Sequence, residues 1–67
     1  MGYLVSNQDG ELRVFVSSPI KDFSRGVWRA SNDKENEDGA TISRSVLATN
    51  LQDICWLDGP FNLDKWN

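Results

Sequence analysis

The residues best placed to do chemistry are four carboxylates in the segment SNDKENEDGA, residues 31–40. Carboxylate oxygens bind hard cations and pair with basic groups, so the segment could hold calcium, imitate a phosphate backbone, or simply be hydrated. An EF-hand calcium loop needs glycine at its sixth position and glutamate at its twelfth. If Gly39 is sixth, Lys34 stands first and Ser45 twelfth, and neither fits. If Asp33 stands first, another aspartate replaces the glycine, so no calcium site is expected.

The same segment accounts for the acidity of the protein. It carries four acids against one lysine, whereas the rest of the chain carries six acids and six bases, and the net charge is −3. Such a run is typical of a solvated loop, and a loop that steers a partner protein is the alternative. The residues predicted to meet that partner are Asp33, Glu35, Glu37 and Asp38. A merely solvated loop predicts that neutralising all four changes the free energy of unfolding by about a few tenths of a kcal/mol.

A second set of residues interleaves arginine with aromatic side chains, in RVF at 13–15 and FSRGVWR at 23–29. Single-stranded nucleic acid is bound by aromatic rings that stack on bases, with arginines along the backbone path. In a half-buried strand, however, such rings pack in the core, and a pI near 4.6 is unlike that of a general nucleic-acid binder. The residues of this nucleic-acid alternative are Arg13, Phe15, Arg25, Trp28 and Arg29.

Few residue types are available for catalysis or metal binding. The chain has no histidine and one cysteine, so it lacks the side chain that titrates near neutral pH and the usual zinc ligands. The tetrapeptide SPIK at 18–21 matches the S-x-x-K pattern of penicillin-binding enzymes, but none of their other motifs is present. We therefore predict no catalytic residues, no metal site and no cofactor.

The cysteine and the tryptophans give two further predictions. Cys55 lies in the apolar run ICWL, which predicts a buried and unreactive thiol. Three tryptophans are too many for so small a core to cover completely. Trp28 and Trp56 are expected in the core, and Trp66 is expected to be exposed and to contact a partner.

These residues must be positioned by short strands. Apolar side chains alternate with others over residues 12–16, which predicts a strand with Leu12, Val14 and Val16 on its inner face. Residues 3–5 are good strand formers, and the turn residues NQDG lie between the two runs. A β-hairpin is therefore the first expected element.

The later elements are less regular. Strands are expected at 27–30 and 41–47. Residues 50–57 fit a short helix capped by Asn50; alternatively, 54–57 and 61–66 fit two strands joined by the turn DGP. We favour the helix, followed by an irregular tail that packs Phe61, Leu63 and Trp66 on the sheet. The fold class expected is mainly β, a small twisted antiparallel sheet or open barrel of about four to five strands, with or without that helix. The chain is expected to form one small domain with an acidic solvated loop at 31–40.

What remains after these exclusions is binding. The start of the chain lacks a signal-peptide pattern and no apolar run is long enough to cross a membrane, so a cytoplasmic location is expected. The expected function is a non-catalytic protein-binding module that engages, and by hypothesis inhibits or modulates, a larger protein. Such a short acidic chain would suit an accessory protein encoded by a virus or mobile element. One alternative is an OB-like or SH3-like domain that binds single-stranded nucleic acid. Another is a structural subunit that is stable as a homo-oligomer.

Overall fold

The structure, a computed structural model, describes residues 2–47 and 52–65 of the chain, and this part is mainly β, as predicted. Its four-stranded antiparallel sheet has the order β5-β2-β1-β6, and a second sheet is the hairpin β3-β4. The strands are β1 (Tyr3–Ser6), β2 (Leu12–Phe15), β3 (Ile20–Asp22), β4 (Val27–Arg29), β5 (Ala40–Ile42) and β6 (Phe61–Asn62). The 3-10 turns η1 (Arg44–Val46) and η3 (Leu63–Lys65) follow β5 and β6.

The β1–β2 hairpin forms where the sequence predicts it. Its antiparallel register places Tyr3 opposite Phe15. In the turn, the Gly10 N–H donates to the Asn7 carbonyl at 3.0 Å. Gly10 has a φ of 92°, which a side chain would disfavour, so the glycine permits this turn.

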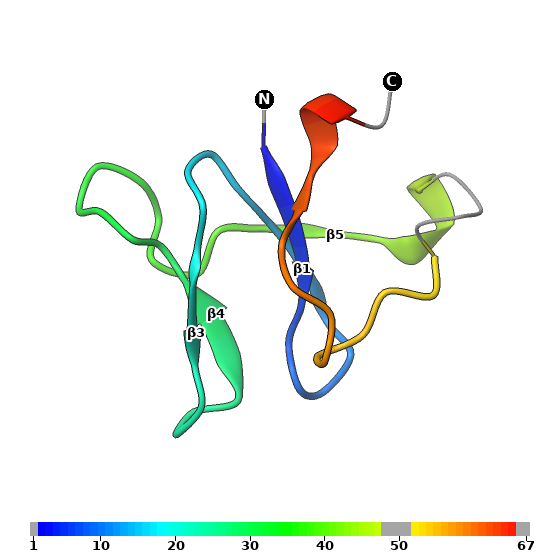
Figure 1. Cartoon of the computed structure of the whole chain (residues 1–67), viewed down its shortest axis with the longest axis horizontal. Helices are drawn as coiled ribbons and strands as arrows, with labels where there is room; N and C mark the ends of the chain where they lie inside the picture. Colours follow the sequence, from blue (N-terminus) through cyan, green and yellow to red (C-terminus); the bar gives the residue numbers. More distant parts are fainter. Residues whose placement is uncertain (1, 48–51, 66–67) are drawn as a thin grey trace.

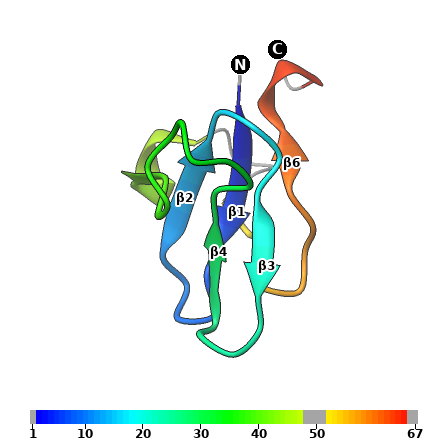
Figure 2. The same ribbon diagram turned by 90° about the vertical axis from the view of Figure 1, so that its left-hand side faces the viewer.

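The four-stranded sheet is covered on both faces. Figure 1 shows it between the β3–β4 hairpin on the left and η1 on the right, and Figure 2 shows the hairpin in front of the sheet. On the hairpin side, Val5, Phe15, Trp28 and Ala30 form one buried cluster, with Trp56 packed against it. On the other side the buried cluster consists of Leu4, Leu12 and Ile54, with partly buried Val14, Ile42, Leu47, Phe61 and Leu63 around it. The central strand β1 is therefore buried on both faces.

This double covering corrects the predicted alternation in β2. Leu12 and Phe15 are both buried although they point to opposite faces, because each face has its own cluster. The strand ends at Phe15, and Val16, expected on the inner face, is 73% exposed. Val14 is half-buried on the Leu12 face.

The region after β5 also departs from the prediction. The strand expected over 41–47 ends at Ile42, and the Ser43 hydroxyl then accepts the Ser45 N–H at 3.3 Å and starts η1. In the described part of 50–57, residues 52–57, no helix forms, while Asn50 lies outside the described residues.

Two side chains use the backbone groups that a helix at 50–57 would need. The Asp58 carboxylate accepts the Cys55 N–H at 2.8 Å. The Arg44 guanidinium donates to the carbonyls of Gln52, at 2.8 Å, and Ile54, at 3.0 Å. Hydrogen bonds from side chains to these backbone groups compete with the backbone hydrogen bonds of a helix. Phe61 and Leu63 pack on the sheet as predicted, but the tail is not irregular, because it forms β6 and η3.

The buried thiol is a wrong prediction, because Cys55 is exposed. The turns over residues 52–58 point successive side chains in different directions, so that Ile54 is 4% exposed whereas Leu57 is 85% exposed. An apolar run therefore does not form a continuous buried segment here.

Within the described ranges, no helix is long and apolar enough to span a membrane.

Candidate functional site

The acidic segment connects β4 to β5 and lies at the opposite end of the β3–β4 hairpin from the hairpin turn (Figure 1). Its residues are exposed except for Glu35 and Gly39, which are half-buried. The Asn32 side chain accepts the Lys34 N–H at 2.9 Å, and the Asn36 side chain accepts the Asp38 N–H at 3.0 Å. The loop is thus a pair of local turns held by asparagine side chains.

Glu35 ties this loop to the end of β2. One carboxylate oxygen accepts the Val16 N–H at 2.9 Å, and the other accepts the Ser17 N–H at 3.2 Å. A carboxylate that receives two backbone N–H groups forms charge-assisted hydrogen bonds. Glu35 therefore has an internal structural role, whatever the loop does in solution.

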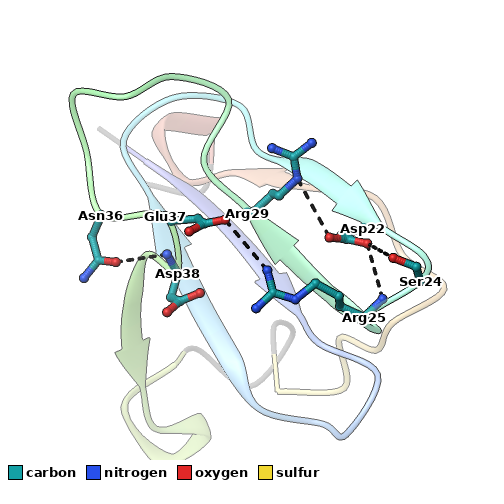
Figure 3. Close-up of polar contacts among 7 residues, drawn as sticks. All are labelled: Asp22, Ser24, Arg25, Arg29, Asn36, Glu37 and Asp38. Carbon is teal, nitrogen blue, oxygen red and sulfur yellow. Dashed lines mark hydrogen bonds and ion pairs between the residues drawn. The ribbon is translucent and has the colours of Figure 1, made fainter.

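Glu37 also faces the protein. Its carboxylate lies 3.8 Å from the Arg25 guanidinium, as Figure 3 shows, and its carbonyl accepts the Ala30 N–H at 2.9 Å. The side chains of Asp33 and Asp38 are exposed and make no hydrogen bond or ion pair with another of the described residues. Of the four acids predicted to meet a partner, Asp33 and Asp38 are thus the two whose carboxylates have no hydrogen bond or ion pair among the described residues.

The turn of the β3–β4 hairpin is fixed by Asp22. Its carboxylate accepts the Ser24 hydroxyl at 2.8 Å and the Arg25 N–H at 3.3 Å (Figure 3). The hydrogen bond from Ser24, together with that from Arg25, holds the pKa of the Asp22 carboxyl below its usual value of 3.8. The Asp22 carbonyl accepts the Gly26 N–H at 3.0 Å, and Gly26 has a φ of 69°. The turn therefore has a defined backbone shape.

The same hairpin is attached to the β1–β2 turn. The Gln8 N–H donates to the Gly26 carbonyl at 2.9 Å. The buried Asn7 side chain accepts the Trp28 N–H at 2.9 Å, and the Trp28 indole donates to the Ser6 carbonyl at 3.1 Å. These bonds join residues that are about twenty positions apart, so the hairpin turn is held against the sheet.

Three aromatic rings and one lysine meet beside this turn. The Trp56 ring contacts Phe23 and Trp28 edge to face, with centroids 6.1 and 6.2 Å apart. The Lys21 ammonium lies 4.4 Å from the Trp56 centroid and 5.6 Å from the Phe23 centroid, and it donates to the Trp56 carbonyl at 2.7 Å. Phe23 is 78% exposed, and Leu57 follows Trp56 in the chain. Lys21, Phe23 and Trp56 contact one another, and Leu57 is included because it directly follows Trp56 and is 85% exposed; we call these four residues the aromatic patch.

The nucleic-acid alternative loses its two stacking rings in this structure. Phe15 is 1% exposed and Trp28 is 5% exposed, so neither presents a free face to a base. Of the arginines, Arg13 is half-buried and pairs with Glu11. Arg29 is exposed and lies 3.9 Å from the Asp22 carboxylate (Figure 3).

Sequence reasoning missed the residues that carry this site. Phe23 is an exposed aromatic residue inside the turn DFSRG, and an aromatic residue between turn formers was the available signal. Arg44 lies outside the aromatic patch and was also missed, because its three hydrogen bonds go to backbone carbonyls 8, 10 and 34 positions away, which no sequence pattern shows. The predicted contact residue Trp66 lies outside the described residues.

The candidate site thus lies beside a fixed hairpin turn and combines two exposed side chains, Phe23 and Leu57, with two half-buried ones, Lys21 and Trp56. Among residues 2–47 and 52–65 there is no pocket, and no three acidic or thiol side chains come together as metal ligands would. No protein family, curated protein or solved structure matches this chain. Function therefore has to be inferred from the residues themselves.

Proposed function

We propose that this protein is a non-catalytic protein-binding module that contacts a larger protein through the aromatic patch. One observation carries the proposal: Phe23 is 78% exposed at the tip of a hairpin whose backbone is held by Asp22 and Gly26. Large exposed apolar side chains that gather on a surface commonly mark a protein interface.

The fixed turn makes Phe23 a suitable anchor. Residues that dominate binding energy are often aromatic, and they lie on surfaces that need little ordering on association. Phe23 is already held against Trp56, and the Asp22 bonds hold the backbone on either side of it. Leu57, which is 85% exposed, adds apolar area next to Trp56.

The acidic loop has a secondary part in this proposal. Asp33 and Asp38 carry the exposed charge without partners among the described residues, so they would steer the encounter rather than form the centre of the interface. Glu35 and Glu37 are engaged with the protein itself. By covering a surface of its partner, a bound module would inhibit or modulate that partner.

The experiment is capture of partners from a lysate by the tagged protein, with and without nuclease. We expect a nuclease-resistant partner that is lost with the double variant Phe23→Ser, Leu57→Ser. The matched control is Val46→Ser, which removes another apolar side chain, 69% exposed, from η1 and should leave capture unchanged. Recovery that disappears with nuclease would favour the nucleic-acid alternative. Equal loss of capture in both variants would overturn the assignment to the aromatic patch.

A further inference from the structure

We propose that the segment of the partner that covers the aromatic patch is acidic, with aspartate or glutamate between apolar side chains, and that Lys21 and Arg25 bind its carboxylates. This inference rests on the proposed protein-binding function and names the chemistry of the partner. It follows from N–H donors that the protein does not use internally, on Lys21, which lies by the Phe23 ring, and on Arg25, two residues after Phe23 in the chain.

Lys21 and Arg25 flank Phe23 in the sequence, and both have unused N–H donors. An ammonium has three donors, and the hydrogen bond of the Lys21 ammonium within the described part of the chain goes to the Trp56 carbonyl. The Arg25 guanidinium has five donors, and its ion pair with Glu37 measures 3.8 Å, longer than a hydrogen bond. Its side chain is 62% exposed.

The nearest acid does not supply the missing acceptors. Asp22 stands between these residues in the sequence, but its carboxylate accepts the Ser24 hydroxyl and the Arg25 N–H and lies near Arg29 (Figure 3). Glu37 is itself 65% exposed and holds Arg25 only at ion-pair distance. In the free protein, water can satisfy the remaining donors of both cations.

Binding of a partner removes the water that satisfies these donors in the free protein. A partner that covers Phe23 removes water from the Lys21 ammonium, which already lies among three aromatic rings. Burying a charged donor without an acceptor is costly, whereas a carboxylate supplies charge-assisted hydrogen bonds. The three rings also favour a cation at this place, which holds the Lys21 ammonium in position to receive the acid.

The local charge agrees with an acidic partner. Near the turn of the hairpin Lys21 and Arg25 stand against Asp22, in a chain whose net charge is −3, whereas Arg29 pairs with Ile20 at the end away from the turn. The acidic loop lies at the other end of the hairpin (Figure 1). The turn end of the hairpin therefore places two cations and one acid around an exposed aromatic ring, an excess of one positive charge that favours a negatively charged apolar segment.

The test is selection from a displayed library of random peptides, with the intact protein as bait. We expect enrichment of peptides with aspartate or glutamate beside apolar residues. Changing the acids of a selected peptide to amides, which leaves the protein untouched, should weaken binding at least roughly tenfold, because each lost bond is to a charged group. Binding should also weaken as salt rises.

Protein variants locate the effect. Arg25→Gln and Lys21→Gln should each weaken binding of the selected acidic peptides. Lys21→Arg, which keeps the positive charge, should retain part of the affinity that Lys21→Gln loses. The matched control is Lys34→Gln, because Lys34 is exposed in the acidic loop and its replacement also removes one positive charge. Equal weakening by Lys34→Gln would overturn the proposal, since it would show a general charge effect.

Three further outcomes separate the possibilities. Selected peptides that lack acids but lose binding to Phe23→Ser would overturn this inference and leave the proposed function standing. If no peptide depends on Phe23, both fall. Displacement of the peptide from the patch by a single-stranded oligonucleotide at equal or lower concentration would overturn an acidic protein partner in favour of nucleic acid.

Discussion

Glu35 gives the sharpest test of the structure, because its bonds predict a clear loss of stability on substitution, whereas a simply hydrated loop predicts almost none. Its carboxylate holds the N–H groups of Val16 and Ser17, which follow β2. Replacing Glu35 by alanine removes both acceptors, whereas glutamine keeps one oxygen and removes the charge. We therefore expect the stability order wild type, Glu35→Gln, Glu35→Ala.

The magnitude follows from the exposure of the bonded groups. A hydrogen bond to a charged group contributes about 1.5–3 kcal/mol. Val16 is 73% exposed and Glu35 is half-buried, so water replaces part of each bond, and we expect about 1 kcal/mol apiece. Glu35→Ala should thus cost about 2 kcal/mol, a large part of the roughly 3–10 kcal/mol expected for a chain of this length. The melting temperature would fall by roughly 8–16 °C.

The assay is urea unfolding followed by tryptophan fluorescence. Asp33→Asn and Asp38→Asn are the matched controls, since both side chains are exposed and unpaired among the described residues, and each should change stability by less than about 0.5 kcal/mol. Faster amide exchange at Val16 and Ser17 in Glu35→Ala would locate the effect. If Glu35→Ala unfolds at the same urea concentration as the two controls, the carboxylate does not anchor the loop and our reasoning fails.

Three other predictions concern the turns and the thiol. Gly39→Ala should destabilise the protein by more than about 1 kcal/mol, because Gly39 has a φ of 69° and an added Cβ would lie 2.9 Å from the Phe15 ring. The control is Gly59→Ala, whose added Cβ would meet nothing within 4 Å. Equal denaturation midpoints for the two variants would contradict the prediction. Native Cys55 should react with a water-soluble thiol reagent nearly as fast as it does after denaturation, and strong protection would restore the buried thiol. The pKa of Asp22, followed by NMR, should lie below 3.8. Because the folded pKa is lowered, the ionised carboxylate stabilises the fold above the unfolded-state pKa, and this stabilisation is lost as pH falls through the folded pKa. Asp22→Asn should remove this loss of stability in acid. A midpoint at or above 3.8 would show that the Ser24 bond does not favour the ionised carboxylate.

Local sequence was sufficient for the first hairpin and for the fold class. Alternating residues at 12–15, strand formers at 3–5 and a glycine-containing turn lie within fifteen residues, and their preferences do not depend on the rest of the chain. The absence of histidine and of a second cysteine likewise limited the available chemistry before any fold was known. The position of the acidic segment between two strands could also be read from its composition.

The faces and the candidate site were decided by tertiary contacts. Phe15 is buried because Trp28 and Ala30 cover its face, and Leu12 is buried because Ile54 covers the other, so no periodicity within β2 could show both. Cys55 is exposed although its neighbours are apolar, because turns rather than a regular element carry them.

The aromatic patch depends on contacts at still greater separation. Lys21 reaches the Trp56 carbonyl across 35 positions, and Glu35 meets backbone groups 18 and 19 positions before it. Whether a carboxylate is hydrated or bonded, and whether a ring is core or surface, depends on which distant groups approach it. Short-range patterns determine the strands and turns of this protein, but burial and pairing are properties of the packed chain, and they decide which residues a partner can touch.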